Sequence, residues 1–280
     1  MNPDYGQAVD VAPGVRRVLA RNPGPFTGWG TNSFIVGRGR LAVIDPGPDS
    51  AEHIAAILRA TAGERVDAIL CTHTHRDHSP GARPLADATG AEIVGCAPLA
   101  VRADDPWGES FDAEYRPDRA LLDGEAVEGD GWRLEAVATP GHASNHLCFA
   151  GGDVLFSGDH VMGWSTSIVS PPDGDMGDYL ASLDKLLARE DRLLLPAHGE
   201  AVTDPGARVG ELIRHRRARE AQLLNLLRAR PAAVSALVRE AYHDTDPRLF
   251  PAAERSVLAH LLDLERRGVV GREGEKWHLR

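Results

Sequence analysis

A short run rich in histidine most constrains what this chain can fold into. It spans residues 72–78 and directly follows an apolar stretch, residues 66–71, whose pattern predicts a buried strand. Imidazole nitrogens and carboxylate oxygens are common ligands of zinc, iron and manganese. We therefore expect half of a metal site at the end of this strand, in preference to a chance cluster of surface histidines. Its candidate ligands are His73, His75, Asp77 and His78.

The rest of the chain predicts an α/β fold in which further strands end in histidine or aspartate. Strands are expected at 15–20, 31–36, 41–44, 91–94, 126–128, 132–138, 147–150, 154–156 and 192–195, with helices near 51–61, 80–89 and 179–189. Residues 97–119 are interpreted as a long loop. Because function clusters where α/β strands end, three more residues become candidate ligands: His142, Asp159 and His198. The other histidines are expected to be structural, with His146 and His160 near the site.

Composition and charge describe an ordinary globular protein with an uneven charge distribution. The 280 residues are 42% hydrophobic and 26% charged, and no stretch approaches the ~20 apolar residues of a membrane span. Residues 1–11 lack the features of a signal peptide, so a cytoplasmic location is expected. From Pro205 onward 15 basic and 10 acidic residues give +5, which leaves 16 basic and 31 acidic residues, or −15, before it. A basic tail suggests an acidic partner or simply solvated helices.

Three cysteines, Cys71, Cys96 and Cys148, are too far apart for a Cys-x-x-Cys site and odd in number. Each lies in an apolar run, so buried thiols are expected. A thiolate ligand at Cys71 or Cys148 is the alternative.

The tail predicts a small second domain. Helices at 207–229, 231–242 and 252–267 precede a hairpin at 268–279, an order typical of winged-helix-like modules. We therefore expect a catalytic domain over 1–204 and a helical domain over 205–280. Such modules bind nucleic acid, form dimer faces or wall an active site, and the sequence leaves these alternatives open.

The ordered set of candidate ligands resembles the metallo-β-lactamase superfamily of hydrolases. The resemblance implies an αββα sandwich with a two-metal site at one edge. It implies that His73, His75 and His142 hold the first metal, that Asp77, His78 and His198 hold the second, and that Asp159 bridges them. His78 and Asp159 depart from the best-known zinc β-lactamases, so the resemblance does not imply antibiotic degradation.

The chain is further similar to the lactamase-β-like endoribonucleases and their bacterial relatives. The similar segments include 22–25, Gly30-Thr31-Asn32-Ser33, His215-Arg216-x-x-Arg219-Glu220 and 256–277. One departure is the loop at 163–177, which is longer here and follows Asp159, so it is expected to reshape the pocket and alter the substrate.

Two divalent ions, zinc in preference to manganese or iron, would activate water for hydrolysis, with Asp77 receiving the proton.

The first expected function is cleavage of single-stranded RNA, with tail arginines on the phosphates. The alternative is a small-molecule thioester or lactone hydrolase of the glyoxalase II-like type, which the acidic first part favours. A binding module with a degenerate site is not supported, because all seven ligand positions are filled. The expected partners are metal ions and RNA or a small ester, with a homodimer possible.

Overall fold

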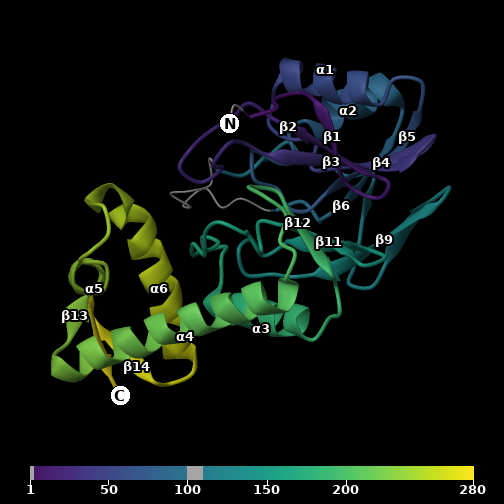
Figure 1. The fold of residues 1–280 in the computed structure, drawn as a ribbon. Coiled ribbons are helices and arrows are strands. Elements are labelled where there is room, and N and C mark those ends of the chain that lie inside the picture. Colours follow the sequence, from purple (N-terminus) through teal and green to yellow (C-terminus); the bar gives the residue numbers. More distant parts are fainter. Residues whose placement is uncertain (1–2, 100–109) are drawn as a thin grey trace. The chain divides into compact units, whose positions relative to one another are not determined.

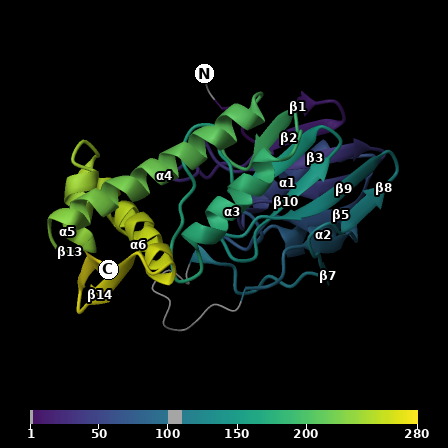
Figure 2. The ribbon, with the colours of Figure 1, turned by 90° about the horizontal axis from the view of Figure 1, so that it is seen from below.

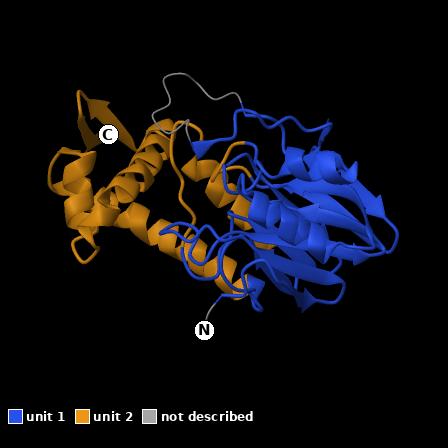
Figure 3. Ribbon diagram, turned by 90° about the horizontal axis from the view of Figure 1, so that it is seen from above, with its two compact units in different colours: residues 1–139, 145–165, 190–205 blue, residues 140–144, 166–189, 206–280 orange. Residues whose placement is uncertain are grey.

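The computed structural model describes residues 3–99 and 110–280, which form two compact units (Figure 3). Unit 1 comprises residues 1–139, 145–165 and 190–205, and unit 2 comprises 140–144, 166–189 and 206–280. Unit 2 therefore joins two earlier segments to the C-terminal residues, while the division into 1–204 and 205–280 stays a prediction. The expected loop at 97–119 lies partly outside the described residues.

Unit 1 is built on two sheets (Figure 1). The first has the order β1-β2-β3-β4-β5-β6-β7, antiparallel from β1 to β4 and parallel from β4 to β7. Its strands are β1 (Ala8–Ala12), β2 (Val15–Leu19), β3 (Asn32–Arg38), β4 (Arg40–Ile44), β5 (Arg65–Cys71), β6 (Glu92–Gly95) and β7 (Arg119–Ala120). The second has the order β12-β11-β10-β9-β8, from β8 (Ala126–Gly129), β9 (Trp132–Ala138), β10 (Leu147–Gly151), β11 (Val154–Gly158) and β12 (Leu193–Pro196).

The apolar inner faces of the two sheets pack against each other. The Phe34 and Phe156 rings, one from each sheet, lie 5.3 Å apart, and both belong to one buried cluster. The indole of Trp132 donates a 2.9 Å hydrogen bond to the Arg40 carbonyl, which joins the sheets at their margin. Burial of these strands explains their apolar runs, since removing apolar surface from water is the main force that stabilises such a core.

Two helices, α1 (Ala51–Ala60) and α2 (Ala82–Thr89), cover one face of the first sheet (Figure 1). The Ser50 hydroxyl accepts from the His53 backbone N–H and caps α1, a role that serine commonly has at the start of a helix. Gly90 ends α2 in the left-handed conformation that glycine adopts without strain. Both helices are close to their predicted positions, and the α/β class is confirmed.

Unit 2 combines helices with a three-stranded sheet of order β13-β15-β14. Its elements are α3 (Met176–Leu187), α4 (Pro205–Ala229), β13 (Ala232–Ala233), α5 (Val234–Ala241), a 3-10 turn at Pro247–Leu249, α6 (Phe250–Arg266), β14 (Val270–Glu273) and β15 (Lys276–Leu279). Figures 1 and 2 show α5, α6 and the hairpin gathered around the end of α4. Trp277, Leu261 and Leu237 lie in their common core.

Two details of the sequence prediction need correction. The helix expected at 231–242 begins only at Val234, because Ala232 and Ala233 pair with β15 instead. Strand β1 was not predicted, because its side chains are only partly buried and its apolar alternation is weak. Within residues 3–99 and 110–280, no helix combines the length and apolar character needed to cross a membrane.

His260 is an unusual member of the unit 2 interior. Its side chain is fully buried on α6, and neither ring nitrogen has a hydrogen-bond partner among the described residues. Burial, reinforced by the charges of Arg216 and Arg219, lowers the pKa of His260 from 6.5 to about 3. The unfolded chain therefore takes up a proton in acid that the folded chain refuses, so this histidine makes folding less favourable as the pH falls below 6.5.

We expect His260→Leu to make stability less sensitive to acid. Between pH 6.5 and 3, unfolding free energy should fall less steeply in the variant than in the parent, by up to about 1.4 kcal/mol per pH unit. Urea denaturation of the metal-free protein at several pH values measures this, with the exposed His243→Leu as control. Parallel curves for His260→Leu and the parent would contradict the buried, neutral state of His260.

Candidate metal centre

The strand order of unit 1 gathers the predicted ligands at one sheet edge. Strands β4 and β5 are parallel neighbours, and so are β11 and β12. Parallel neighbours end on the same side, so Asp159 and His198, which follow β11 and β12, are brought together. The Leu147 N–H donates to the Thr72 carbonyl at 2.8 Å, which ties the end of β5 to the second sheet. Backbone pairing alone thus explains why residues far apart in sequence meet.

Four of the predicted residues form a tight group. His198 Nε2 lies 3.2 Å from an Asp77 carboxylate oxygen and 3.3 Å from an Asp159 oxygen. His78 Nε2 lies 3.6 Å from the same two oxygens. His78, His198 and Asp159 are buried, whereas the Asp77 side chain is 27% exposed. Asp77 is therefore the member of this group that solvent reaches most easily.

His73 and His75 continue the group along the chain. His73 Nε2 and His75 Nδ1 are 2.8 Å apart, and the His73 and His78 rings lie 4.1 Å apart. His75 stacks on Phe111 at 4.5 Å, which fixes its ring plane. One ligand atom each from His73, His78 and Asp159 lies within 4.8 Å of the others. Six of the seven predicted ligands thus converge within unit 1.

His142, the seventh, belongs to unit 2. Its Nδ1 lies 2.6 Å from the Ile168 carbonyl oxygen. Because a carbonyl only accepts hydrogen bonds, Nδ1 carries the proton and Nε2 keeps a lone pair. That tautomer suits a metal ligand, and the assignment of His142 to the first metal stays a prediction.

The donor set fits divalent metal ions. His78 Nε2 is buried and has no hydrogen-bond partner among the described residues, so it is available to a cation. Burial lowers the pKa of His78, but the carboxylates of Asp77 and Asp159 outweigh it and hold the pKa well above its ordinary value. Burial lowers the pKa of His198, but the Asp159 carboxylate outweighs it and raises the pKa to about 10. Burial raises the pKa of Asp159, but His198 and His78 outweigh it and hold that pKa well below its ordinary value. This concentration of negative charge attracts cations, and imidazole with carboxylate is a ligand set for zinc, manganese or iron.

Asp45 is a functional residue that sequence reasoning missed. It follows β4, is almost fully buried and has a positive φ of 48°. One carboxylate oxygen accepts from the Thr72 N–H at 2.8 Å, and the other accepts from the Thr72 hydroxyl at 2.8 Å and from His78 Nδ1 at 3.0 Å. Asp45 therefore accepts from Nδ1 and orients the ring, so that Nε2 is the nitrogen that would bind a metal ion once its proton is displaced. Its only signal was a carboxylate at a strand end followed by Pro-Gly.

The Gly30-Thr31-Asn32-Ser33 motif holds His198. His198 Nδ1 lies 3.0 Å from the Gly30 carbonyl oxygen, and the Asn32 amide donates to the Pro196 and Gly199 carbonyls at 2.9 Å each. Gly30 has a φ of 140°, and a Cβ there would lie 2.0 Å from the Ala20 carbonyl oxygen. Only glycine fits this position, which gives the motif a physical role.

His146 lies next to the site, as its sequence position indicated. Its Nδ1 is 2.8 Å from the Thr139 hydroxyl, and its Nε2 accepts from the Asp159 N–H at 3.2 Å. The three cysteines are buried and form no disulfide with one another, as predicted. Burial raises the pKa of Cys71 well above its ordinary value, which disfavours a thiolate there.

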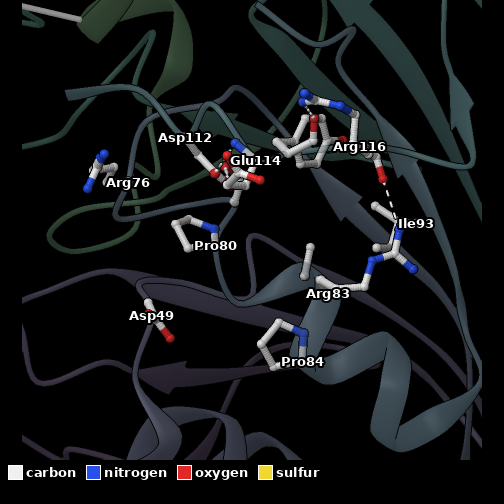
Figure 4. Close-up of a pocket in the computed structure, with 12 residues that line it drawn as sticks. Asp49, Arg76, Pro80, Arg83, Pro84, Ile93, Asp112, Glu114 and Arg116 are labelled. Carbon is white, nitrogen blue, oxygen red and sulfur yellow. Dashed lines mark hydrogen bonds between the residues drawn. The ribbon is translucent and has the colours of Figure 1, made fainter. Parts of the chain in front are cut away.

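A separate pocket of about 370 Å³ lies beside the histidine run (Figure 4). Arg76, Arg83 and Arg116 line it together with the acidic side chains Asp49, Asp112 and Glu114. Arg76 donates to the Phe111 carbonyl at 3.2 Å and Arg83 to the Arg116 carbonyl at 3.1 Å. None of the seven candidate ligands lines this pocket, so it is distinct from the metal centre.

Comparison with known families gives two matches along the chain. Residues 26–198 match the family model of the metallo-beta-lactamase superfamily. Residues 233–277 match the model of the beta-lactamase associated winged helix domain. The second match covers α5, α6 and the hairpin, which agrees with the winged-helix-like module expected from the sequence.

Individual relatives extend these matches to nearly the whole chain. The chain is 31% identical to the Beta-lactamase-like protein 2 homolog of Drosophila melanogaster, over 91% of this chain and 88% of the relative. It is 34% identical to the atrochrysone carboxyl ACP thioesterase of Aspergillus chevalieri, over 78% of this chain and 67% of the relative. It superposes on a metallo-beta-lactamase family protein from Thermus thermophilus with a TM-score of 0.80 and 26% identity, over 97% and 100%.

We expect Asp45→Asn to weaken the site although it removes no predicted ligand. If the new amide keeps its oxygen toward the Thr72 N–H, its NH₂ faces His78 Nδ1 and forces the other tautomer. Unfolding free energy should fall by about 1–3 kcal/mol, and less divalent metal should be retained after purification. Denaturation and elemental analysis measure both.

The matched control is Asp67→Asn on β5, whose carboxylate pairs with Arg40 at the surface at 2.8 Å. That variant should keep its metal and lose little stability. Equal metal content in Asp45→Asn and the parent would contradict the role given to Asp45.

Proposed function

The chain belongs to the metallo-beta-lactamase superfamily of metal-dependent hydrolases, and on that premise we propose that it is a two-metal hydrolase of thioesters. The observation that carries the two-metal assignment is the convergence of His73, His75, Asp77, His78, Asp159 and His198, with His78 Nε2 buried and without a hydrogen-bond partner among the residues described. His142 completes the set. Divalent ions held there, zinc in preference to manganese or iron, would lower the pKa of a water and polarise the bond to be cut.

The proposed ligand roles follow the two groups of residues. His73, His75 and His142 would hold the first ion, Asp77, His78 and His198 would hold the second, and Asp159 would contribute to both. A ring nitrogen must lose its proton to bind metal, and the hydrogen bonds from His78 Nδ1 to Asp45 and from His198 Nδ1 to the Gly30 carbonyl leave Nε2 as the metal-binding nitrogen of each ring. The protein thus supplies a preorganised set of lone pairs.

Asp77 is the proposed general base. It is the most exposed member of its group, and its carboxylate lies within 3.2 Å of His198 Nε2. Burial raises the pKa of Asp77, but His78 and His198 outweigh it, so the carboxylate stays ionised. It accepts one proton of the attacking water as the water oxygen bonds to the thioester carbon. The carbon–sulfur bond then breaks, and the thiolate leaves with the electron pair.

Two observations favour a thioester over RNA. A relative that covers most of this chain is named as an acyl-carrier-protein thioesterase. In addition, carboxylates of unit 2 already pair with many of the tail cations, which leaves less free positive charge for a polyanion. These are Arg208, Arg217, Arg230, Arg248, Arg266 and Arg267.

Exposed aromatic side chains next to His198 support an apolar acyl group. Trp164 is 48% exposed and lies against the turns at Gly28 and Gly199, the residue after His198. Phe26 and Trp29, on the Gly28 turn, are 52% and 58% exposed. Large exposed apolar side chains in one region are typical of a binding surface.

Cleavage of single-stranded RNA is the second candidate. It rests on the segments that resemble the lactamase-β-like endoribonucleases, among them Gly30-Thr31-Asn32-Ser33 and residues 256–277. The same exposed aromatics would then stack on bases. Ionic strength separates the candidates, since phosphate contacts weaken steeply with salt.

We expect the metal-loaded protein to hydrolyse acyl thioesters with little dependence on salt. His75→Ala should lower kcat/KM by more than about 100-fold, because it removes a ligand of the first ion. Initial rates on a panel of thioester, lactone, β-lactam and RNA oligomer, each with zinc, manganese and iron, measure this. His243→Ala, an exposed histidine in unit 2, is the control.

RNA cleavage that falls steeply with salt, in the absence of thioester turnover, would replace the first candidate with the second. Activity that survives His75→Ala unchanged would contradict both.

A further inference from the structure

We propose that two arginines of the C-terminal helices, Arg216 on α4 and Arg266 on α6, are positioning residues for His142. The inference rests on the proposed function, in which His142 binds the first metal ion. It assigns unit 2 a direct part in metal binding, beyond that of a wall or a partner surface. All the contacts that carry it lie within unit 2.

Arg216 is a buried cation that binds the backbone next to Ile168, the residue that contacts His142. Its side chain is almost fully buried, and its guanidinium donates to the Ser167 carbonyl and, at 3.1 Å, to the Ser256 hydroxyl. The next carbonyl after Ser167, that of Ile168, receives the His142 Nδ1 proton at 2.6 Å. Arg216 therefore fixes the backbone next to the acceptor that orients the imidazole.

Arg216 also acts on His142 through Tyr179 and Gly141. The guanidinium carbon lies 5.2 Å from the centre of the Tyr179 ring on α3. The Tyr179 backbone in turn fills the space beside Gly141, where a Cβ would lie 2.3 Å from the Tyr179 Cα. Gly141 has a φ of 135° and directly precedes His142, so the packing of α3 sets where the histidine begins.

Arg266 acts on the same turn through Asp175. Its guanidinium makes two bonds to the Asp175 carboxylate, at 2.6 and 2.7 Å. Asp175 caps α3 by accepting from the Asp178 N–H, and its own N–H donates to the Gly141 carbonyl at 2.9 Å. A two-bond arginine–carboxylate pair has a defined geometry, so it fixes the start of α3 against α6.

These contacts join segments of unit 2 that are far apart in the sequence. Residues 140–144 and 166–189 cluster with 206–280, and Arg216 on α4 and Arg266 on α6 both bond to the segment 166–189. The loop at 163–177 supplies Ser167, Ile168 and Asp175. It is therefore held at three points, by Arg216, His142 and Arg266 respectively.

Zinc binding by the folded protein tests the inference directly. We expect the parent to bind two ions and His142→Ala to bind only one, because it loses the first ion. Arg216→Met should still bind the first ion, but about 10- to 100-fold more weakly than the parent. In the double variant His142→Ala/Arg216→Met, the losses of zinc affinity should not add, because both substitutions act through the His142 imidazole. Equilibrium dialysis with a competing chelator, followed by elemental analysis, measures stoichiometry and affinity. Arg217→Met, on the same helix with a weak 3.7 Å pair to Asp184, is the matched control and should bind as the parent does.

A second readout separates positioning from simple packing. In the metal-free protein, the nitrogen chemical shifts of the His142 ring should report protonated Nδ1 in the parent and a mixture of tautomers in Arg216→Met. Arg216→Lys keeps the charge but cannot reach both Ser167 and Ser256, so its zinc affinity should be intermediate. If Arg216→Met does not fold, Arg266→Met carries the same test, because its guanidinium is partly exposed.

The outcomes distinguish this inference from the proposed function. If His142→Ala loses one ion while both arginine variants bind two with parental affinity, the positioning role is overturned and the two-metal assignment stands. If His142→Ala keeps both ions, the proposed ligand set fails first.

Discussion

A single buried carboxylate at the end of β4 underlies the metal centre. Asp45 bonds the Thr72 N–H, the Thr72 hydroxyl and His78, so the end of β5 and the orientation of one ligand depend on it. A buried carboxylate is costly unless its oxygens are satisfied, and here all its bonds go to the residues that lead into the histidine run. The strand pairing of β4 with β5 places Asp45 there.

The same principle recurs at two other proposed ligands, whose rings are each oriented by a backbone carbonyl. His198 is oriented by the Gly30 carbonyl, and His142 by that of Ile168. The two carbonyls come from distant parts of the chain. Gly30 lies in the turn before β3, and Ile168 lies in a loop that the C-terminal helices anchor. Within unit 2, hydrogen bonds thereby connect one proposed ligand, His142, to the C-terminal helices.

Sequence patterns identified most of what local chemistry determines. Strand β5 is observed at Arg65–Cys71 against an expected 66–71, because an apolar run bounded by polar turns has few other solutions. The candidate ligands were likewise visible as histidines and aspartates at strand ends. Long-range supports were not, since Asp45 and Thr72 are 27 residues apart, and Arg216 and Ser167 are 49 apart. Tail arginines looked like phosphate-binding groups for the same reason, whereas Arg216 is buried and used internally.

We propose that this chain holds two metal ions at the ends of its strands. Anomalous diffraction from crystals grown with zinc, recorded on both sides of the zinc absorption edge, tests it most directly. We expect two peaks, one bounded by Asp77, His78 and His198 and the other by His73 and His75, with Asp159 between them. A single peak, or peaks away from these side chains, would contradict it.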